Sequence, residues 1–107
     1  DEVRERLAGV EFRQFTGSTL KNIDALIAQL HDIRTTGFAF DREEHEPGIH
    51  CVAASICSAG GSILAGVSVT APAFRVSMQQ LESWAGEVCN TAKAIEAEVG
   101  ARLSPRA

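Results

Sequence analysis

Hydroxyl and thiol side chains alternate with small apolar residues in two strand-like runs within residues 40–72. Successive side chains of a strand point to opposite faces of its sheet. Cys51 would therefore share a face of the first run with Ile49, and Ser68 would share a face of the second run with Thr70. If both faces lie on the same side of the sheet, they line a concavity with hydroxyls, a thiol and backbone. Such a surface is suited to holding a small ligand.

The two runs are predicted to form a β-hairpin. They cover residues 48–57 and 62–70, and residues 58–61, which read Ser-Ala-Gly-Gly, lie between them. Glycine supplies the positive φ that a tight antiparallel turn demands. The other face of the second run carries small and β-branched side chains suited to a core: Ile63, Ala65, Val67 and Val69. The other face of the first run carries His50, Val52, Ala54 and Ile56.

Two helices and a short strand are predicted around the hairpin. A helix over residues 22–36 has Asn22 as a plausible N-cap and Gly37 after its end, and residues 38–41 follow as a strand. The last helix begins after Ser77 and ends at residue 100. Its seam recurs at spacings of three and four residues: Met78, Leu81, Ala85, Val88, Ala92, Ile95 and Val99. This order of elements indicates an α/β or α+β fold, in which helices flank an antiparallel sheet.

Composition excludes several classes of function. The 107 residues are 45% hydrophobic and 22% charged, which is typical of a folded domain. A net charge of -4 and the lack of a basic cluster argue against this segment itself binding nucleic acid. No apolar run approaches the ~20 residues needed to cross a bilayer. The chain has three cysteines and no secretory signal, so we expect a reducing, cytoplasmic location.

Metal binding and catalysis are the competing kinds of chemistry. The side chains that could ligate zinc are His45, His50, Cys51, Asp41, Glu43, Glu44 and Glu46. His50 and Cys51 are adjacent on a strand and should point to opposite faces, which weakens a shared metal site. No helix N-terminus follows Cys51 to lower its pKa, and nothing orients a histidine beside it, so we expect no enzyme. A zinc-binding regulatory domain and a pure oligomerisation module remain as alternatives to a ligand sensor.

Several motifs in the same order resemble the C-terminal effector-binding domain of the IclR family of bacterial transcriptional regulators. They are Thr16-Gly-Ser-Thr19-Leu20, Asp41-x-Glu-Glu-His-x-x-Gly48-x-x-Cys51-x-Ala53-Ala54, and Gly60-Gly61-x-x-x-Ala65-x-x-Ser68-Val69-Thr70-x-Pro72. The helix before the first strand and the final helix fit the same pattern. The resemblance covers nearly the whole chain, from about residue 12 to residue 103.

The resemblance implies a ligand sensor with a fold similar to the GAF-type sensory domains. Residues 1–107 would form the C-terminal part of that domain, which is incomplete at its N-terminus. An N-terminal winged helix-turn-helix, absent from this chain, would read DNA. The partners implied are a small metabolite, either a carboxylate or an aromatic acid, and further copies of the chain in a homodimer or homotetramer. We expect no cofactor, no resident metal and no membrane contact.

Four residues match the positions that line the pocket in this family, and a fifth lies on the same strand face as Cys51. The polar ones are Asp41, Cys51, Ser68 and Thr70, and Ile49 would form an apolar wall. Each also has a simpler interpretation: Asp41 could cap the turn after its strand, Cys51 could be a small buried apolar side chain, and the hydroxyls could be half-exposed without a ligand. An ionised Asp41 would repel an anion, so it binds a ligand hydroxyl or is protonated or paired.

Overall fold

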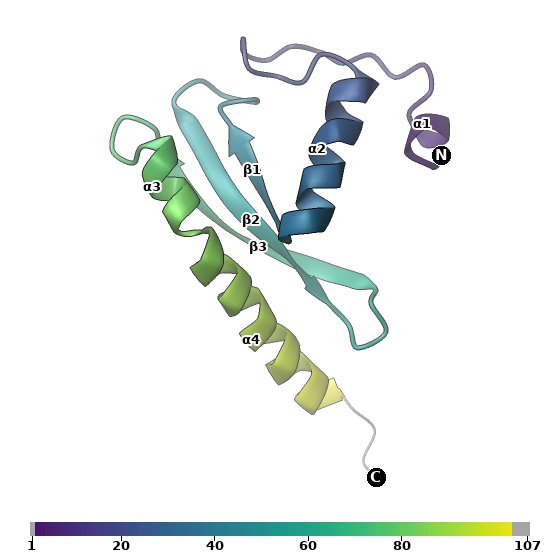
Figure 1. The fold of residues 1–107 in the computed structure, drawn as a ribbon, viewed down its shortest axis with the longest axis vertical. Helices are drawn as coiled ribbons and strands as arrows, with labels where there is room; N and C mark the ends of the chain where they lie inside the picture. The colour runs from purple at the N-terminus through teal and green to yellow at the C-terminus, as the bar shows by residue number, and fades with distance from the viewer. Residues whose placement is uncertain (1, 104–107) are drawn as a thin grey trace.

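A three-stranded antiparallel sheet forms the centre of the fold. The computed structural model describes residues 2–103, with only the backbone described at residue 103. The strands are β1 (Phe38–Arg42), β2 (Ile49–Cys57) and β3 (Ile63–Pro72), and they lie side by side in the order β1-β2-β3 (Figure 1). The mixed α+β class and the antiparallel sheet with flanking helices are confirmed.

Four helices accompany the sheet in the described part of the chain: α1 (Glu2–Arg6), α2 (Ile23–Thr36), α3 (Met78–Ser83) and α4 (Ala85–Leu103). In Figure 1, α3 and α4 run one after the other along the sheet, whereas α2 stands beside β1. Both ends of α2 agree with the prediction. The Asn22 side chain accepts a hydrogen bond from the Ala25 N–H at 2.9 Å, and Gly37 adopts a left-handed conformation with φ 87°.

The predicted single helix over residues 77–100 is wrong in two respects. It is divided at Trp84, whose N–H bonds to the carbonyl of Leu81, three residues back, at 3.0 Å. Such a tightened turn interrupts the α-helical ladder and marks the boundary between α3 and α4. Trp84 itself packs against the core. The helix also continues through Gly100 to residue 103, because an interior glycine weakens a helix by only about 1 kcal/mol relative to alanine.

The hydrophobic core lies between β2 and the last two helices. Alternate residues of β2 are buried: His50, Val52, Ala54 and Ile56. Except for His50, they form one cluster with buried residues of α3 and α4, namely Leu81, Ala85, Val88 and Ala92. Phe38 and Phe40 of β1 pack against the same cluster. The predicted seam of the final helix is thus confirmed in its central part, since it packs on one face of the sheet.

The core face predicted for the second strand is wrong at several positions. Ala54 pairs with Val67 and Ile56 with Ala65, but Cys57 pairs with Ile63, so a β-bulge leaves one extra residue in β3. The bulge moves Ile63 out of the alternation, and its exposed fraction is 73%. Val67 packs against the core, whereas Val69 is 37% exposed. The physical reason is that β3 is an edge strand in the described sheet and the helices pack mainly on β2.

The hairpin turn uses one glycine for its conformation. Gly61 has φ 88°, while Gly60 is not among the residues with positive φ. The Ser58 N–H donates to the Ser62 carbonyl at 2.8 Å, and the Gly61 N–H donates to the Ser58 carbonyl at 2.9 Å. At the same end of β2, the Cys57 N–H donates to a carboxylate oxygen of Glu96 on α4 at 2.8 Å. This bond ties the end of the strand to the helix.

Substitution of Leu81 by alanine tests the position of the core. Leu81 is fully buried, so Leu81→Ala should lower the free energy of unfolding by about 2 to 5 kcal/mol. The matched control is Leu64→Ala on β3, where the side chain is 53% exposed and the expected loss is less than about 1 kcal/mol. Urea denaturation measures both; equal losses would contradict the packing described above.

Candidate functional site

The strand register brings three predicted site residues into one row across the sheet. Asp41 of β1 pairs with Cys51 of β2, and Cys51 pairs with Thr70 of β3. Because directly paired residues share a face, all three side chains lie on the face opposite the buried side chain of Val52. The thiol and hydroxyl faces therefore lie on the same side of the sheet, which is the condition that a shared concavity requires.

The remaining two predicted residues flank this row. Ser68 pairs with Ala53, which in turn pairs with Ala39. The next row on the same face therefore consists of small side chains, one of which carries a hydroxyl. Ile49 pairs with Pro72 at the other end of β2 and is partly buried. The hydroxyl residues of β3 are exposed, which leaves this face open along the edge strand.

The Cys51 thiol has an unusual environment within the row. Burial raises its pKa above the ordinary value, and the negative charge of Asp41 raises it further. Hydrogen bonds with the Asp41 backbone and with the Thr70 side chain act in the opposite direction, and the charge of Glu44 adds a smaller increase. A raised pKa keeps the thiol protonated at neutral pH, which is the opposite of what an activated nucleophile requires. Cys51 is therefore suited to contact a ligand and not to attack one.

Asp41 also caps the turn that follows its strand. Its Oδ1 accepts a hydrogen bond from the Glu44 N–H at 2.9 Å. The simpler interpretation of Asp41 as a turn cap is thus correct, and it is compatible with the position of the residue in the row. The bond fixes the carboxylate at the end of β1, where it lies beside Cys51.

The acidic loop between β1 and β2 is closed by its own side chains. The Gly48 N–H donates to Glu43 Oε1 at 2.8 Å, and the Arg42 N–H donates to Glu44 Oε2 at 3.2 Å. Glu43 has φ 58°, a left-handed conformation that residues other than glycine adopt at a cost. The carboxylates of Glu43 and Glu44 thus accept hydrogen bonds from the backbone of the loop and of its flanking strand.

Thr16 and Thr19 hold this loop from outside, a role that the sequence did not reveal. The Thr16 hydroxyl donates to the Glu43 carbonyl, and the Thr19 hydroxyl donates to the Glu44 carbonyl. Nearby, the ring centroids of Phe15 and His45 are 4.8 Å apart. The sequence signal is the threonine pair itself, which resembles a segment of the family but does not indicate a bond to the loop.

A groove of about 950 Å³ lies between α2 and the sheet, next to the row. Its floor includes Ala39, Ala53, Ser55 and Gly66, which belong to the same face as the thiol and hydroxyls. His31 and Arg34 of α2 lie in its wall. The five predicted site residues lie further along the face, outside the lining of this groove. The sheet face therefore continues from the polar row into a more apolar hollow with a basic group in its wall.

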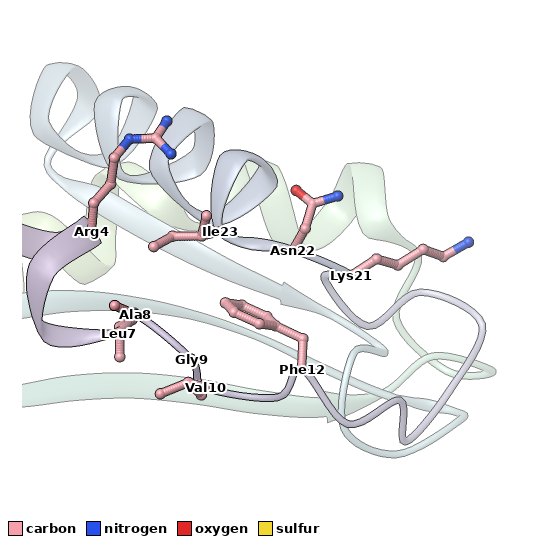
Figure 2. Close-up of a pocket in the computed structure, with 9 residues that line it drawn as sticks. All are labelled: Arg4, Leu7, Ala8, Gly9, Val10, Phe12, Lys21, Asn22 and Ile23. Atoms are coloured by element: carbon pink, nitrogen blue, oxygen red, sulfur yellow. The ribbon is translucent and has the colours of Figure 1, made fainter.

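A second pocket, of about 390 Å³, is formed by the N-terminal segment and the start of α2 (Figure 2). The Phe12 ring points into it, and Arg4 and Lys21 contribute to its lining. The Arg4 guanidinium pairs with Asp24 at 2.6 Å. No strand residue lines this pocket, so it is separate from the row on the sheet.

The residues considered for zinc do not converge. His50 is 3% exposed on the core face, and its Nε2 has no hydrogen-bond partner within the described part of the chain, while Cys51 lies on the opposite face. Among residues 2–103, no group of three histidine, cysteine or acidic side chains is placed to hold a metal ion. The same part of the chain also contains no helix that is long and apolar enough to cross a membrane.

The sequence matches a family model and individual regulators that point to the same family. The model of the family described as "Bacterial transcriptional regulator IclR C-terminal" matches residues 1–97. The transcriptional regulator KdgR of Escherichia coli K12 is 33% identical over 100 residues, covering 94% of this chain and 38% of the relative. The transcriptional repressor AllR of Salmonella typhimurium LT2 is 34% identical over 100 residues, covering 90% of this chain and 37% of the relative. The chain thus spans less than two fifths of either regulator, and neither is described as an enzyme.

Solved structures agree with the sequence matches. The C-terminal domain of E. coli KdgR has a TM-score of 0.80 at 33% identity, with 94% of this chain and 61% of that domain covered. The inducer-binding domain of PobR from Acinetobacter, a double mutant solved with 3-hydroxybenzoic acid, has a TM-score of 0.78 over 86% of this chain and 53% of that chain. Its identity is 22%, so this likeness concerns the fold alone. The fold is that of the GAF-like effector domains.

Removal of the Asp41 charge tests the geometry of the row. Asp41→Asn keeps an oxygen for the Glu44 N–H but removes the charge that raises the Cys51 pKa, so this pKa should fall. With Cys57 and Cys89 replaced by serine, the pH dependence of alkylation by iodoacetamide measures the pKa of Cys51 alone.

The control for this substitution is Glu98→Gln on α4, where a carboxylate pairs with Arg102 on the helix surface. It should leave the Cys51 pKa unchanged. An unchanged pKa in Asp41→Asn would show that the two side chains are not neighbours in solution.

Proposed function

The chain belongs to the IclR C-terminal family of bacterial transcriptional regulators, and from that premise we propose that it binds a small organic acid on the face formed by Asp41, Cys51, Ser68 and Thr70. The observation that carries the proposal is the strand register, which gathers a carboxylate, a thiol and a hydroxyl in one row. Ile49 adds an apolar wall at the end of this face.

The charges of the face favour a ligand that carries both a hydroxyl and a carboxylate. The Asp41 carboxylate accepts hydrogen bonds and repels anions, so it is suited to a ligand hydroxyl. The hydroxyls of Ser68 and Thr70 can donate to a carboxylate on the ligand. The ligand carboxylate would therefore lie towards Ser68, one row away from Asp41, and the hydroxyl towards Asp41 and Cys51. The 3-hydroxybenzoic acid bound by the PobR domain has both groups.

Ligand binding would act on DNA through a linked domain. Residues 1–107 would form the C-terminal part of the effector-binding domain, joined in the whole regulator to an N-terminal winged helix-turn-helix. A ligand that binds one quaternary arrangement better than another shifts the population towards it. We propose a cytoplasmic homodimer or homotetramer, since symmetric assemblies of this kind match near-palindromic operators.

Thermal unfolding in the presence of organic acids tests whether the face binds a ligand. A ligand at 100 times its Kd stabilises the folded state by about 2.7 kcal/mol, which raises the melting temperature by several degrees in a domain of this size. The panel pairs 3-hydroxybenzoate with benzoate, and lactate with propionate. We expect the hydroxy acid of a pair to give the larger shift, and the absence of any shift would count against the proposal.

Two substitutions test where such a ligand binds. Thr70→Val removes a hydroxyl at constant volume and Ser68→Leu adds apolar bulk, and both positions are exposed, so the fold should be retained. Each should weaken binding of the acid found in the thermal screen by about tenfold or more, corresponding to the loss of a hydrogen bond to a charged group.

The matched control is Thr35→Val on α2, where the hydroxyl donates to the His31 carbonyl within the same helix. Isothermal titration calorimetry measures the affinities. Wild-type affinity in both Thr70→Val and Ser68→Leu would refute the assignment of the site.

A further inference from the structure

The acidic loop between β1 and β2 has no strand partner of its own to hold it. Its residues 43–48 lie between two paired strands, and its local hydrogen bonds run mainly from backbone N–H groups to carboxylates, besides a bond from the Ile49 N–H to the Glu46 carbonyl. Glu43 is in a left-handed conformation, which must be maintained by its surroundings. The Ala73 N–H donates to the Gly48 carbonyl at the far end of the loop, and the Phe15 ring lies against His45, but the distant contacts at Glu43 and Glu44 are the two threonine hydroxyls.

We propose that Thr16 and Thr19 are positioning residues that hold the acidic loop so that Asp41 stays beside Cys51 in the polar row. The inference deepens the proposed function and rests on it for its consequence in ligand binding. The effect of the threonines on Asp41 and Cys51 can be measured without a ligand.

A short chain of bonds connects the threonines to Asp41. The Thr19 hydroxyl donates to the Glu44 carbonyl, and the Glu44 N–H donates to Asp41 Oδ1 at 2.9 Å. The Thr16 hydroxyl donates to the carbonyl of Glu43, the residue with positive φ. Glu44 is thus held on one side by Thr19 and holds Asp41 on the other.

Hydrogen bonds within residues 15–19 fix both threonine side chains. The backbone N–H groups of Phe15 and Thr16 donate to Thr19 Oγ1 at 3.1 Å and 3.0 Å, and the Ser18 N–H donates to Thr16 Oγ1 at 2.9 Å. Each hydroxyl oxygen therefore accepts from its own turn and directs its proton towards the loop. A serine retains this pattern at either position, whereas a valine of the same shape removes it.

The experiment measures the pKa of Cys51 in the protein with Cys57 and Cys89 replaced by serine. The test variant is Thr16→Val with Thr19→Val, the conservative variant is Thr16→Ser with Thr19→Ser, and the control is Thr35→Val. We expect the valine pair to lower the Cys51 pKa towards its value in Asp41→Asn, because the charge that raises it moves away. The serine pair and Thr35→Val should match the parent.

A double-mutant cycle separates an effect through Asp41 from a change in burial. If the threonines act through Asp41, the valine pair lowers the Cys51 pKa in the parent but causes little further change in Asp41→Asn. An equal decrease in both backgrounds would overturn the proposal, because the threonines would then act on the burial of Cys51 or through the charge of Glu44, which also raises this pKa, and not through Asp41. An unchanged pKa in the valine pair would overturn it as well.

Binding of 3-hydroxybenzoate by calorimetry provides the second readout. The valine pair should weaken its affinity at least about fivefold, and the serine pair should leave it unchanged, since a preorganised group loses less on binding. If the parent protein does not bind this acid, the proposed function is weakened, while the thiol measurement still decides the role of the threonines. If the parent binds it and the valine pair binds equally well with an unchanged Cys51 pKa, the positioning role is wrong.

Discussion

The antiparallel register of β2 is the constraint on which the site depends. With this register, His50, Val52, Ala54 and Ile56 face the helices, and Cys51 lies between Asp41 and Thr70 on the other face. A slip of one residue would exchange the two faces of the strand, so that its core residues would be exposed and the polar row of Asp41, Cys51 and Thr70 would be buried. The burial of Val52 and its neighbours against α3 and α4 thus selects the register, and the same register assembles the polar row.

The sheet alone does not place every group. Asp41 lies at the end of β1, where a loop with a strained residue begins, and its carboxylate caps that loop. The loop in turn is bonded to the turn that contains Thr16 and Thr19, which precedes α2. The open side of the face is the edge of β3, where Ser68 and Thr70 are exposed. Hydrogen bonds fix the carboxylate at the Asp41 side of the face, and solvent reaches the hydroxyls at the β3 side. This combination is consistent with a surface that binds a ligand.

Much of this arrangement could be predicted from the sequence, because it follows from local rules. Alternation assigned the two faces of β2, and the caps at Asn22, Gly37 and Ser77 located helix ends. The failures have non-local causes. The bulge near Ile63 breaks a strict alternation, and the division at Trp84 reflects packing against the core. The bonds from Thr16 and Thr19 join residues more than twenty positions apart, so no local pattern could reveal them.

The central claim is that the face carrying Asp41, Cys51, Ser68 and Thr70 binds a small hydroxy acid. Titration of the isotope-labelled protein with 3-hydroxybenzoate, followed by amide chemical shifts, tests it most directly. The account predicts that the largest saturating shifts occur in residues 41, 51, 68 and 70 and their immediate neighbours. Saturating shifts confined to α4 or to the pocket around Phe12, or no shifts at millimolar concentrations of the acid, would contradict it.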